Sequence, residues 1–379
     1  MSKAKSDRVW RRLAGAVVRA GAIPFPVTDA LLEFLKRKVT FEQAEFLKIF
    51  RDISLNWKQV LERSGLPEEE ARKHLEALLA NGVLTRTKSR TTGVEVFSLM
   101  PLFPGMIEFS LMAGRASEEE RRLASIIERI FADLRDGTQR NYDTFMPAVK
   151  QYPVPARVVP VEAQLDVGVD EVVPPESLPE ILEGQEVVAL THCYCRMQRD
   201  LTGKPCAFTD AREICLIFGK VAQHAIDYGF AKPITKERAL AILRASEEDG
   251  LVHKIFHTKL DLSRDVEGIC SCCRDCCGIF RLFHEGALPY HSVTSYESSV
   301  DAEACVGCGE CVERCPMDAL NLDGDAGVAV VQRERCIGCG VCTRACPQDP
   351  PAISLVRTGR REVFVLPPRL GGKGKDAAS

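Results

Sequence analysis

Residues 305–316 (CVGCGECVERCP) and 336–347 (CIGCGVCTRACP) repeat one cysteine spacing, C-x2-C-x2-C-x3-C-P. The two-residue gaps let three thiolates of a tight loop reach three corners of an iron–sulfur cube. The fourth cysteine, on the next helix, then points away toward a second cube. Glycines within each loop let the backbone wrap closely and direct N–H groups at the sulfur atoms. Between the loops, residues 317–335 have strand–turn–strand character, and the spacing predicts two iron–sulfur clusters.

This segment resembles a bacterial two-cluster ferredoxin domain with a βαβ pseudo-repeat. Pro316 and Pro347 stand where that family has its prolines. Structural zinc is the alternative, but zinc prefers isolated cysteine pairs in separate knuckles, and two full tandem copies disfavour it. The resemblance implies two ligand sets: Cys305, Cys308, Cys311 and Cys346 for one [4Fe-4S] cluster, and Cys336, Cys339, Cys342 and Cys315 for the other.

The composition limits the remaining possibilities. The chain has 379 residues, long enough for two or three domains, and 45% of them are hydrophobic. Its 17 cysteines are an odd number, so a complete disulfide framework within one chain is excluded. The formal net charge of -3 gives no general sign of nucleic-acid binding.

The N-terminal residues 1–27 predict a short amphipathic helix and an arm. Arg19 interrupts the apolar stretch, which therefore does not read as the core of a signal peptide. No run of about 18 apolar residues is present, so we expect no transmembrane helix. A cytoplasmic, reducing location follows as the expectation, and there cysteines usually serve metal or redox chemistry.

Residues 28–150 are predicted to form a winged-helix-like domain with a following helix. Helical spacing over 28–50, 56–66 and 67–84 is followed by a hairpin pattern over 85–100, the element order of a winged helix. A further helix begins at Ser117, where Glu120 completes a capping box.

The rest of the chain divides into four segments. The proline- and valine-rich residues 151–184 predict an extended connector. A mostly helical, cysteine-rich middle domain follows over 185–298, with helices expected over 211–229 and 235–250. The ferredoxin domain covers 299–366, and 367–379 are expected to be a disordered tail. The predicted fold class is therefore multidomain α+β.

The middle domain contains the run CSCCRDCC at 270–277. Cys270, Cys273 and Cys276 repeat the three-corner spacing and predict one further cluster, or two that share the run. Its fourth ligand is expected to be Cys193, Cys206 or Cys215, the last on a predicted helix. The remaining thiols of this region, Cys195, Cys272 and Cys277, are further candidate ligands.

Other interpretations of these residues remain open. Zinc could replace the cluster, because cysteine spacing alone does not fix the metal. Vicinal thiols could instead form a dithiol switch. His192 could be a ligand or an ordinary packed residue. Arg196 and Arg274 could offset a cluster's negative charge or could lie at the surface.

The whole chain resembles a family of cytoplasmic iron–sulfur proteins that join a winged-helix-like part, a cysteine-rich middle and a two-cluster ferredoxin end. The resemblance is carried by segments 9–26 (VWRRLAGAVVRAGAIPFP), 101–111 (PLFPGMIEFSL), 192–196 (HCYCR), the predicted helix with Cys215, 247–253 (EEDGLVH) and 270–277. It implies this architecture but supplies no reaction.

Three functions fit these features. We expect an electron carrier or oxidoreductase subunit that exchanges electrons with a redox partner protein or complex. The alternatives are a redox-responsive winged-helix regulator and a reductase with a catalytic middle cluster. The sequence has no phosphate loop, dinucleotide fingerprint or nucleophile elbow, which favours a carrier over a stand-alone enzyme.

The winged-helix-like part is expected to dock a partner or a second copy of the chain. Its third helix opens with Glu68, Glu69 and Glu70, which would repel phosphates and disfavour DNA reading. Basic residues of the hairpin argue the other way, so DNA binding stays open; they are Arg86, Lys88 and Arg90.

Overall fold

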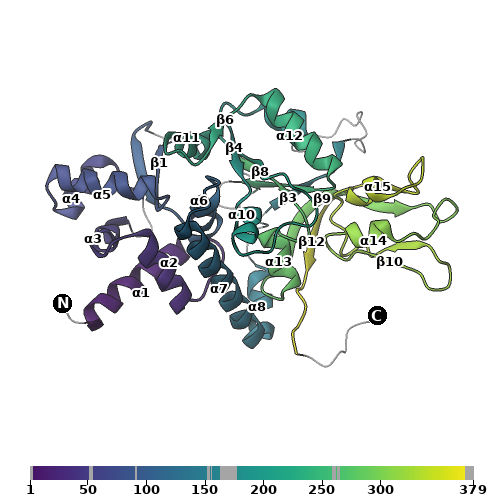
Figure 1. The fold of residues 1–379 in the computed structure, drawn as a ribbon, viewed down its shortest axis with the longest axis horizontal. Helices are drawn as coiled ribbons and strands as arrows, with labels where there is room; N and C mark the ends of the chain where they lie inside the picture. Colours follow the sequence, from purple (N-terminus) through teal and green to yellow (C-terminus); the bar gives the residue numbers. More distant parts are fainter. Residues whose placement is uncertain are drawn as a thin grey trace. The chain divides into compact units, whose positions relative to one another are not determined.

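The computed structural model describes residues 3–50, 54–89, 92–151, 154, 156–162, 177–257, 262 and 265–371. They fall into two compact units. The first comprises Met1–Asp133, Glu186–Pro205 and Cys215–Ile234, and the second comprises Leu134–Gln185, Cys206–Ile214 and Thr235–Ser379. Of the predicted disordered tail, 372–379 lie outside the described residues. Helices and sheets are mixed, as expected for a multidomain α+β protein (Figure 1).

The first unit is mainly helical. Its helices are α1 (Lys3–Arg19), α2 (Asp29–Lys38), α3 (Phe41–Phe46), α4 (Trp57–Ser64), α5 (Glu68–Ala80), α6 (Ile107–Leu111), most of α7 (Glu118–Arg140), α10 (Tyr194–Leu201) and α11 (Gly219–Asp227). Its strands are β1 (Leu84–Lys88), β2 (Glu95–Leu99), β4 (Val188–His192), most of β5 (Glu213–Phe218) and β6 (Lys232–Pro233).

Local sequence signals explain several of these elements. The predicted hairpin over 85–100 is confirmed by antiparallel pairing of β1 with β2. The predicted capping box also forms, because the backbone N–H of Ser117 donates to Glu120 at 3.1 Å. The helical pattern over 28–50 is divided between α2 and α3, since Thr40 caps a new helix through a reciprocal contact with Gln43.

The prediction that residues 211–229 form one helix was wrong in its first half. Strand β5 occupies Glu213–Phe218, and α11 begins only at Gly219. The side chains of EICLIF alternate between buried and half-buried, the two-residue period of a strand. The middle domain is accordingly not mostly helical, because it contains β4, β5 and β6 and also β7 (Val252–His257) and β8 (Val266–Cys272).

The second unit is built on an extended sheet. Its helices are α8 (Tyr142–Val149), α9 (Leu178–Glu183), α12 (Lys236–Glu248), α13 (Gly278–His284), α14 (Glu310–Arg314) and α15 (Val341–Ala345). Its strands are β3 (Ala156–Val159), β7 (Val252–His257), β8 (Val266–Cys272), β9 (Tyr290–Val300), β10 (Leu320–Leu322), β11 (Ala329–Val331) and β12 (Ile353–Val365). In the sheet the neighbours run β12-β9-β3-β7-β8.

The connector predicted over 151–184 is partly regular. Strand β3 pairs with β7 and touches β9 in parallel, while α9 follows near the end of the segment. Residues 163–176 of this segment lie outside the described part of the chain.

The sheet positions the two cysteine loops. Strands β9 and β12 pair over a long antiparallel register in which Ile353 faces Val300 at one end. Residues 301–352, with both loops and the short β10–β11 hairpin, connect these two strands at that end (Figure 1). A shared apolar core includes Met317 and Ile337, which are almost completely buried. Among the helices of the described residues, none is both long and apolar enough to cross a membrane.

Candidate metal centres

The first centre is a cavity bounded by four cysteines of the C-terminal motifs. Cys305, Cys308, Cys311 and Cys346 line an empty volume of about 360 Å³ that is partly open to solvent. Apolar side chains close the remaining walls, among them Val300 and Ile353. Cys346 comes from the second motif, so residues from both loops meet here.

The second centre is a similar cavity of about 320 Å³. Its sulfur atoms belong to Cys315, Cys336, Cys339 and Cys342. Cys315 comes from the first motif, which reverses the arrangement of the first centre. The two cavities therefore divide the eight thiols into the two sets that the ferredoxin resemblance implies.

Both cavities fit a cubane better than a single ion. Among the described residues, no three of these eight thiols lie within 4.8 Å of one another, whereas three thiols elsewhere do. Backbone N–H groups point at the ligand sulfurs, as from Ala329 to Cys305 at 3.4 Å and from Ala319 to Cys315 at 3.3 Å. Separated thiolates, apolar walls and N–H donors are what an iron–sulfur cluster requires.

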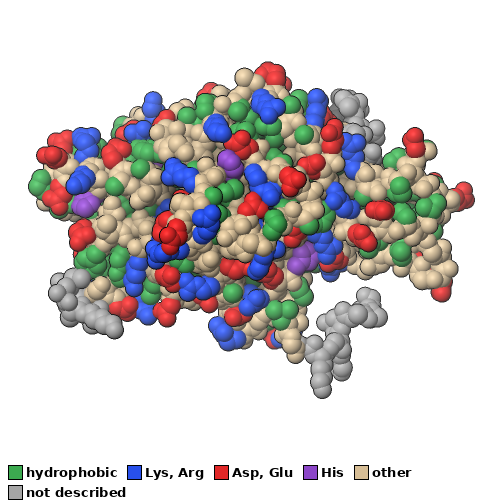
Figure 2. Space-filling model, in the orientation of Figure 1, with side chains coloured by type: hydrophobic (Ala, Val, Ile, Leu, Met, Phe, Trp, Pro, Cys, Tyr) green, Lys and Arg blue, Asp and Glu red, His purple; other side chains and the backbone are tan. Residues whose placement is uncertain are grey.

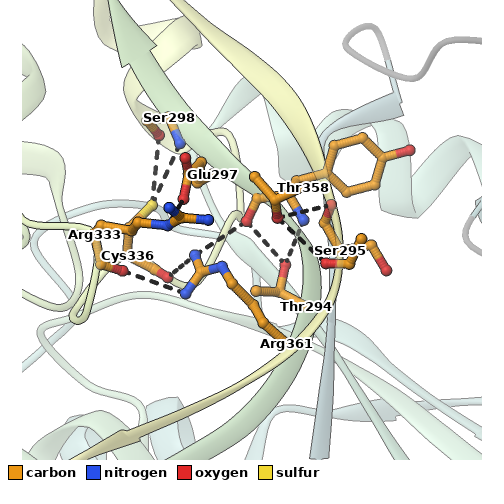
Figure 3. Close-up of polar contacts among 10 residues, drawn as sticks. Thr294, Ser295, Glu297, Ser298, Arg333, Cys336, Thr358 and Arg361 are labelled. Carbon is orange, nitrogen blue, oxygen red and sulfur yellow. Dashed lines mark hydrogen bonds and ion pairs between the residues drawn. The ribbon is translucent and has the colours of Figure 1, made fainter.

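Side chains from the sheet support the second centre (Figure 3). The hydroxyl of Ser298 lies 3.1 Å from Cys342 Sγ, and its backbone N–H donates to Cys336 Sγ at 3.5 Å. Arg361 Nη2 donates to the carbonyl oxygens of Cys336 and Tyr296 at 2.5 and 3.2 Å. Ser298 and Arg361 could not be identified from the sequence, because no motif marks them.

Burial sets the protonation of the second centre. It raises the pKa of Cys342 to about 12, although the Ser298 hydroxyl opposes the shift. The pKa of Cys339 is also raised well above its usual range, mainly by burial and next by Cys342. Ligation of iron must therefore release protons from these thiols, since thiolates are the ligands.

The first centre reaches the surface. Cys308 is exposed, and the side chain of the adjacent Val306 is 62% exposed. Figure 2 shows hydrophobic and acidic side chains over α14 and β10, two elements that contribute to the wall of this cavity. Leu322 of β10 lines the cavity and is also exposed.

The nine thiols of the middle region gather into three groups. The predicted loop of Cys270, Cys273 and Cys276 is divided between two of them. Side chains alternate between the two faces of β8, so Cys270 and Cys272 lie on one face of the strand. Cys273 comes directly after the strand and belongs to a different group of thiols. The three groups are Cys193, Cys195 and Cys215; Cys206, Cys273 and Cys276; and Cys270, Cys272 and Cys277.

The group in the first unit joins the end of β4, the start of α10 and β5. Hydrogen bonds from Cys195 and Cys215 lower the pKa of the Cys193 thiol well below its usual range, and the positive charge of Arg196 adds to the effect. Arg196 is 0% exposed, so its interpretation as a surface residue was wrong. The backbone N–H of His192 donates to the carbonyl of Met112 at 3.0 Å.

A buried lysine accompanies Cys270, Cys272 and Cys277. Lys254 Nζ lies 3.7 Å from Cys277 Sγ and 4.0 Å from the centre of the Phe280 ring. Burial alone would lower the pKa of Lys254, but the negative charge of Cys272 and Cys277 raises it. Lys254 was not among the residues predicted from the sequence, where a lysine within the apolar strand VHKIFH was the available signal.

The remaining group consists of Cys206, Cys273 and Cys276. All three side chains are buried, and their sulfur atoms lie within 4.8 Å of one another. Hydrogen bonds from Cys273 and Cys276 lower the pKa of Cys206 far below its usual range. Arg274, inside the same turn, donates to the carbonyl of Cys315 at 2.9 Å.

Comparison with known proteins identifies one of these regions. Residues 298–355 match the family model of the 4Fe-4S dicluster domain. No curated protein matches the chain. The matched residues contain both cavities and all eight of their cysteines. The C-terminal part of the chain therefore carries a 4Fe-4S dicluster domain.

Proposed function

We propose that the protein transfers single electrons between partner proteins through the two clusters of its C-terminal domain. The observation that carries this proposal is the pair of four-cysteine cavities within one matched dicluster domain. A bound [4Fe-4S] cluster supplies one-electron redox chemistry, with a potential set by hydrogen bonds, charge and solvent exposure. The protein holds the clusters, excludes water from one of them and presents the other to a partner.

The arrangement of α14 supports transfer between the two centres. Cys311 lies in this helix and lines the first cavity, while Cys315 ends it and lines the second. Four residues of helix rise only about 6 Å, so the two centres are close neighbours. Helix α15 provides the same link between Cys342 and Cys346.

The exposed first centre is the proposed site of exchange with the partner. Its surface combines Val306 and Leu322, both exposed, with nearby carboxylates of Asp323 and Asp325. An apolar patch with acidic neighbours fits a partner whose docking face is apolar at its centre and basic at its rim. The deeply buried second centre would then store the electron away from water.

A further cluster in the middle region belongs to this proposal. The group Cys270, Cys272 and Cys277 offers three of its ligands, with the fourth supplied by another donor. The buried ammonium of Lys254 beside Cys277 supports an anionic centre, because a buried cation needs a nearby negative charge. A reducing compartment such as the cytoplasm would keep these thiols available.

We propose that the winged-helix-like residues 28–100 dock a partner or a second copy of the chain rather than DNA. Helix α5 presents Glu68, Glu69 and Glu70 to solvent at its first turn. Arg86, one of the basic residues of the hairpin, is paired with Asp227 at 3.4 Å and is therefore partly neutralised. Arg90 lies outside the described residues.

The test is an oxygen-free affinity capture from native cells, followed by electron exchange with the oxidoreductase that co-purifies. We expect that partner to reduce or oxidise the wild-type protein rapidly. Cys308→Ser should retain partner binding while losing most of the exchange rate. A protein that exchanges electrons with no captured partner, but whose loss of clusters changes DNA binding, would favour the regulator instead.

A further inference from the structure

Two segments distant in the sequence bring three buried thiols together in the second unit. Cys206 Sγ lies 3.6 Å from Cys273 Sγ and 3.5 Å from Cys276 Sγ, and the latter two sulfur atoms are 3.0 Å apart. All three side chains are less than 10% exposed. Three buried sulfur atoms within 4.8 Å of one another have the arrangement of a thiolate metal site.

Two of the three sulfur separations, 3.5 and 3.6 Å, are close to those around a single ion, and the third, 3.0 Å, is shorter. Zinc–sulfur bonds of about 2.3 Å in a tetrahedral site place neighbouring sulfur atoms about 3.8 Å apart. In contrast, no three of the eight thiols around the two cluster cavities lie within 4.8 Å of one another, among the described residues. We propose that Cys206, Cys273 and Cys276 bind one thiolate-preferring divalent ion, with Zn²⁺ as the best fit, rather than a cluster.

The surrounding contacts are those of a built site. The carboxylate of Asp275 accepts a hydrogen bond from the backbone N–H of Ala207 at 2.9 Å, which fastens the two segments beside the thiols. The backbone N–H of Cys276 donates to Cys273 Sγ at 3.3 Å and favours its thiolate form. An ion here crosslinks residues that are 67 positions apart in the chain.

The same turn contacts the second cluster centre. Arg274, between two of the proposed ligands, donates to the carbonyl of Cys315 at 2.9 Å and pairs with Asp318 at 2.8 Å. A metal ion that holds residues 273–276 in place therefore also holds the guanidinium of Arg274 beside Cys315, a ligand of the second cluster. Loss of the ion should change the electronic properties of the second cluster without removing it.

The test begins with the intact wild-type protein, purified without oxygen. Zinc analysis should find about one ion per chain, and X-ray absorption at the zinc edge should show at least three sulfur ligands at about 2.3 Å. This measurement needs no variant and so does not depend on the folding of one. A chain without zinc whose Cys273 and Cys276 form a disulfide would overturn the proposal.

Variants then assign the ligands. Cys206→Ser and Cys273→Ser should each lose about one zinc per chain while keeping iron and acid-labile sulfide, which also shows that the dicluster domain is folded. Ser271→Ala, a buried change of similar size that removes no sulfur, should keep the zinc. In Cys206→Ser the paramagnetic signal of the second cluster should shift.

Two further outcomes contradict the proposal. Loss of iron and sulfide together from Cys206→Ser, with no zinc in the wild type, would mean that these thiols hold a cluster. Full retention of zinc in both ligand variants would place the ion elsewhere. Neither outcome affects the electron-transfer proposal, which depends on the eight thiols of the dicluster domain.

Discussion

Arg361 Nη2 lies 2.5 Å from the carbonyl oxygen of Cys336, the first cysteine of the second motif. The same guanidinium donates to the carbonyl oxygens of Tyr296 and Arg333 at 3.2 and 3.3 Å (Figure 3). One side chain of β12 therefore ties the start of a cluster loop to β9. Because a guanidinium carries a fixed charge, it also places a cation close to the second centre.

Arg361→Gln should weaken the second centre selectively. The substitution removes a charged hydrogen-bond donor to the cluster loop. A hydrogen bond from a charged group contributes about 1.5–3 kcal/mol to stability. We expect about half of the dicluster iron to be released roughly tenfold faster in air, followed by visible absorbance and iron analysis. Arg360→Gln, at an exposed neighbouring position, is the matched control. Equal rates in both variants would show that the contact does not support the cluster.

Ser298→Ala should make the reduction potential of the second cluster more negative. The Ser298 hydroxyl lies 3.1 Å from Cys342 Sγ, and a donor to a ligand sulfur stabilises the more negative, reduced state. A net hydrogen bond of about 0.5–1.5 kcal/mol corresponds to a shift of about 20–60 mV for one electron. Ser299→Ala, exposed on the same strand, should leave the potential unchanged in an EPR-monitored titration.

Gly338→Ala should prevent the second loop from closing. Gly338 has a φ of 63°, and an added Cβ would lie 2.3 Å from the carbonyl oxygen of Tyr296. Gly359→Ala is the control, because Gly359 also has a positive φ, of 74°, but has nothing within 4 Å of that position. Both variants carry backbone strain of about 1–2 kcal/mol, so a larger loss of iron in Gly338→Ala reports the clash alone.

Lys254→Met should destabilise the second unit and remove the cluster proposed at Cys270, Cys272 and Cys277. Lys254 is 1% exposed, and removing one partner of a buried charge pair costs about 3–5 kcal/mol. Oxygen-free urea unfolding and iron analysis measure both effects. Lys232→Met, at an exposed strand position, should change neither. Unchanged iron and stability in Lys254→Met would show that the group holds no anionic centre.

His224 should make the first unit sensitive to acid. Burial lowers the pKa of His224 to about 4, below its value of 6.5 in the unfolded chain. As the pH falls, the unfolded state therefore binds the proton first. The free energy of unfolding decreases by roughly 3 kcal/mol as the pH falls from 6.5 toward 4. His224→Phe should remove this loss.

Urea unfolding followed by tryptophan fluorescence checks this prediction, because both tryptophans of the chain, Trp10 and Trp57, lie in the first unit. His74→Phe, whose wild-type side chain is partly exposed, serves as the control. The same acid sensitivity in wild type and His224→Phe would contradict the account.

The sequence predicted the dicluster domain well because its information is local. Each cluster loop is specified by cysteine and glycine positions within about a dozen residues, so the spacing alone predicts the geometry. The helices at α4, α5 and α12 were similarly predictable from their caps and periodicity. Strand β5 was not, because its six residues run directly into a helix and the apolar pattern continues across the junction.

The middle thiols were harder to assign because their grouping depends on tertiary structure. Spacing alone grouped Cys270 with Cys273, yet the pleat of β8 and the turn after it separate them. Pairing of Cys206 with Cys273 and Cys276 depends on a contact across the chain that no local pattern specifies. Lys254, Ser298 and Arg361 likewise gain their roles only from pairing between strands.

The most direct test of the central claim is an EPR-monitored reductive titration of the wild type beside Cys308→Ser and Cys339→Ser. Two one-electron centres are expected in residues 298–355 of the wild type. Each variant should lose a different centre, and the EPR signal of the remaining cluster should lose its coupling to the missing one. A protein with no acid-labile sulfide, or with no reducible signal that either substitution removes, would contradict the account.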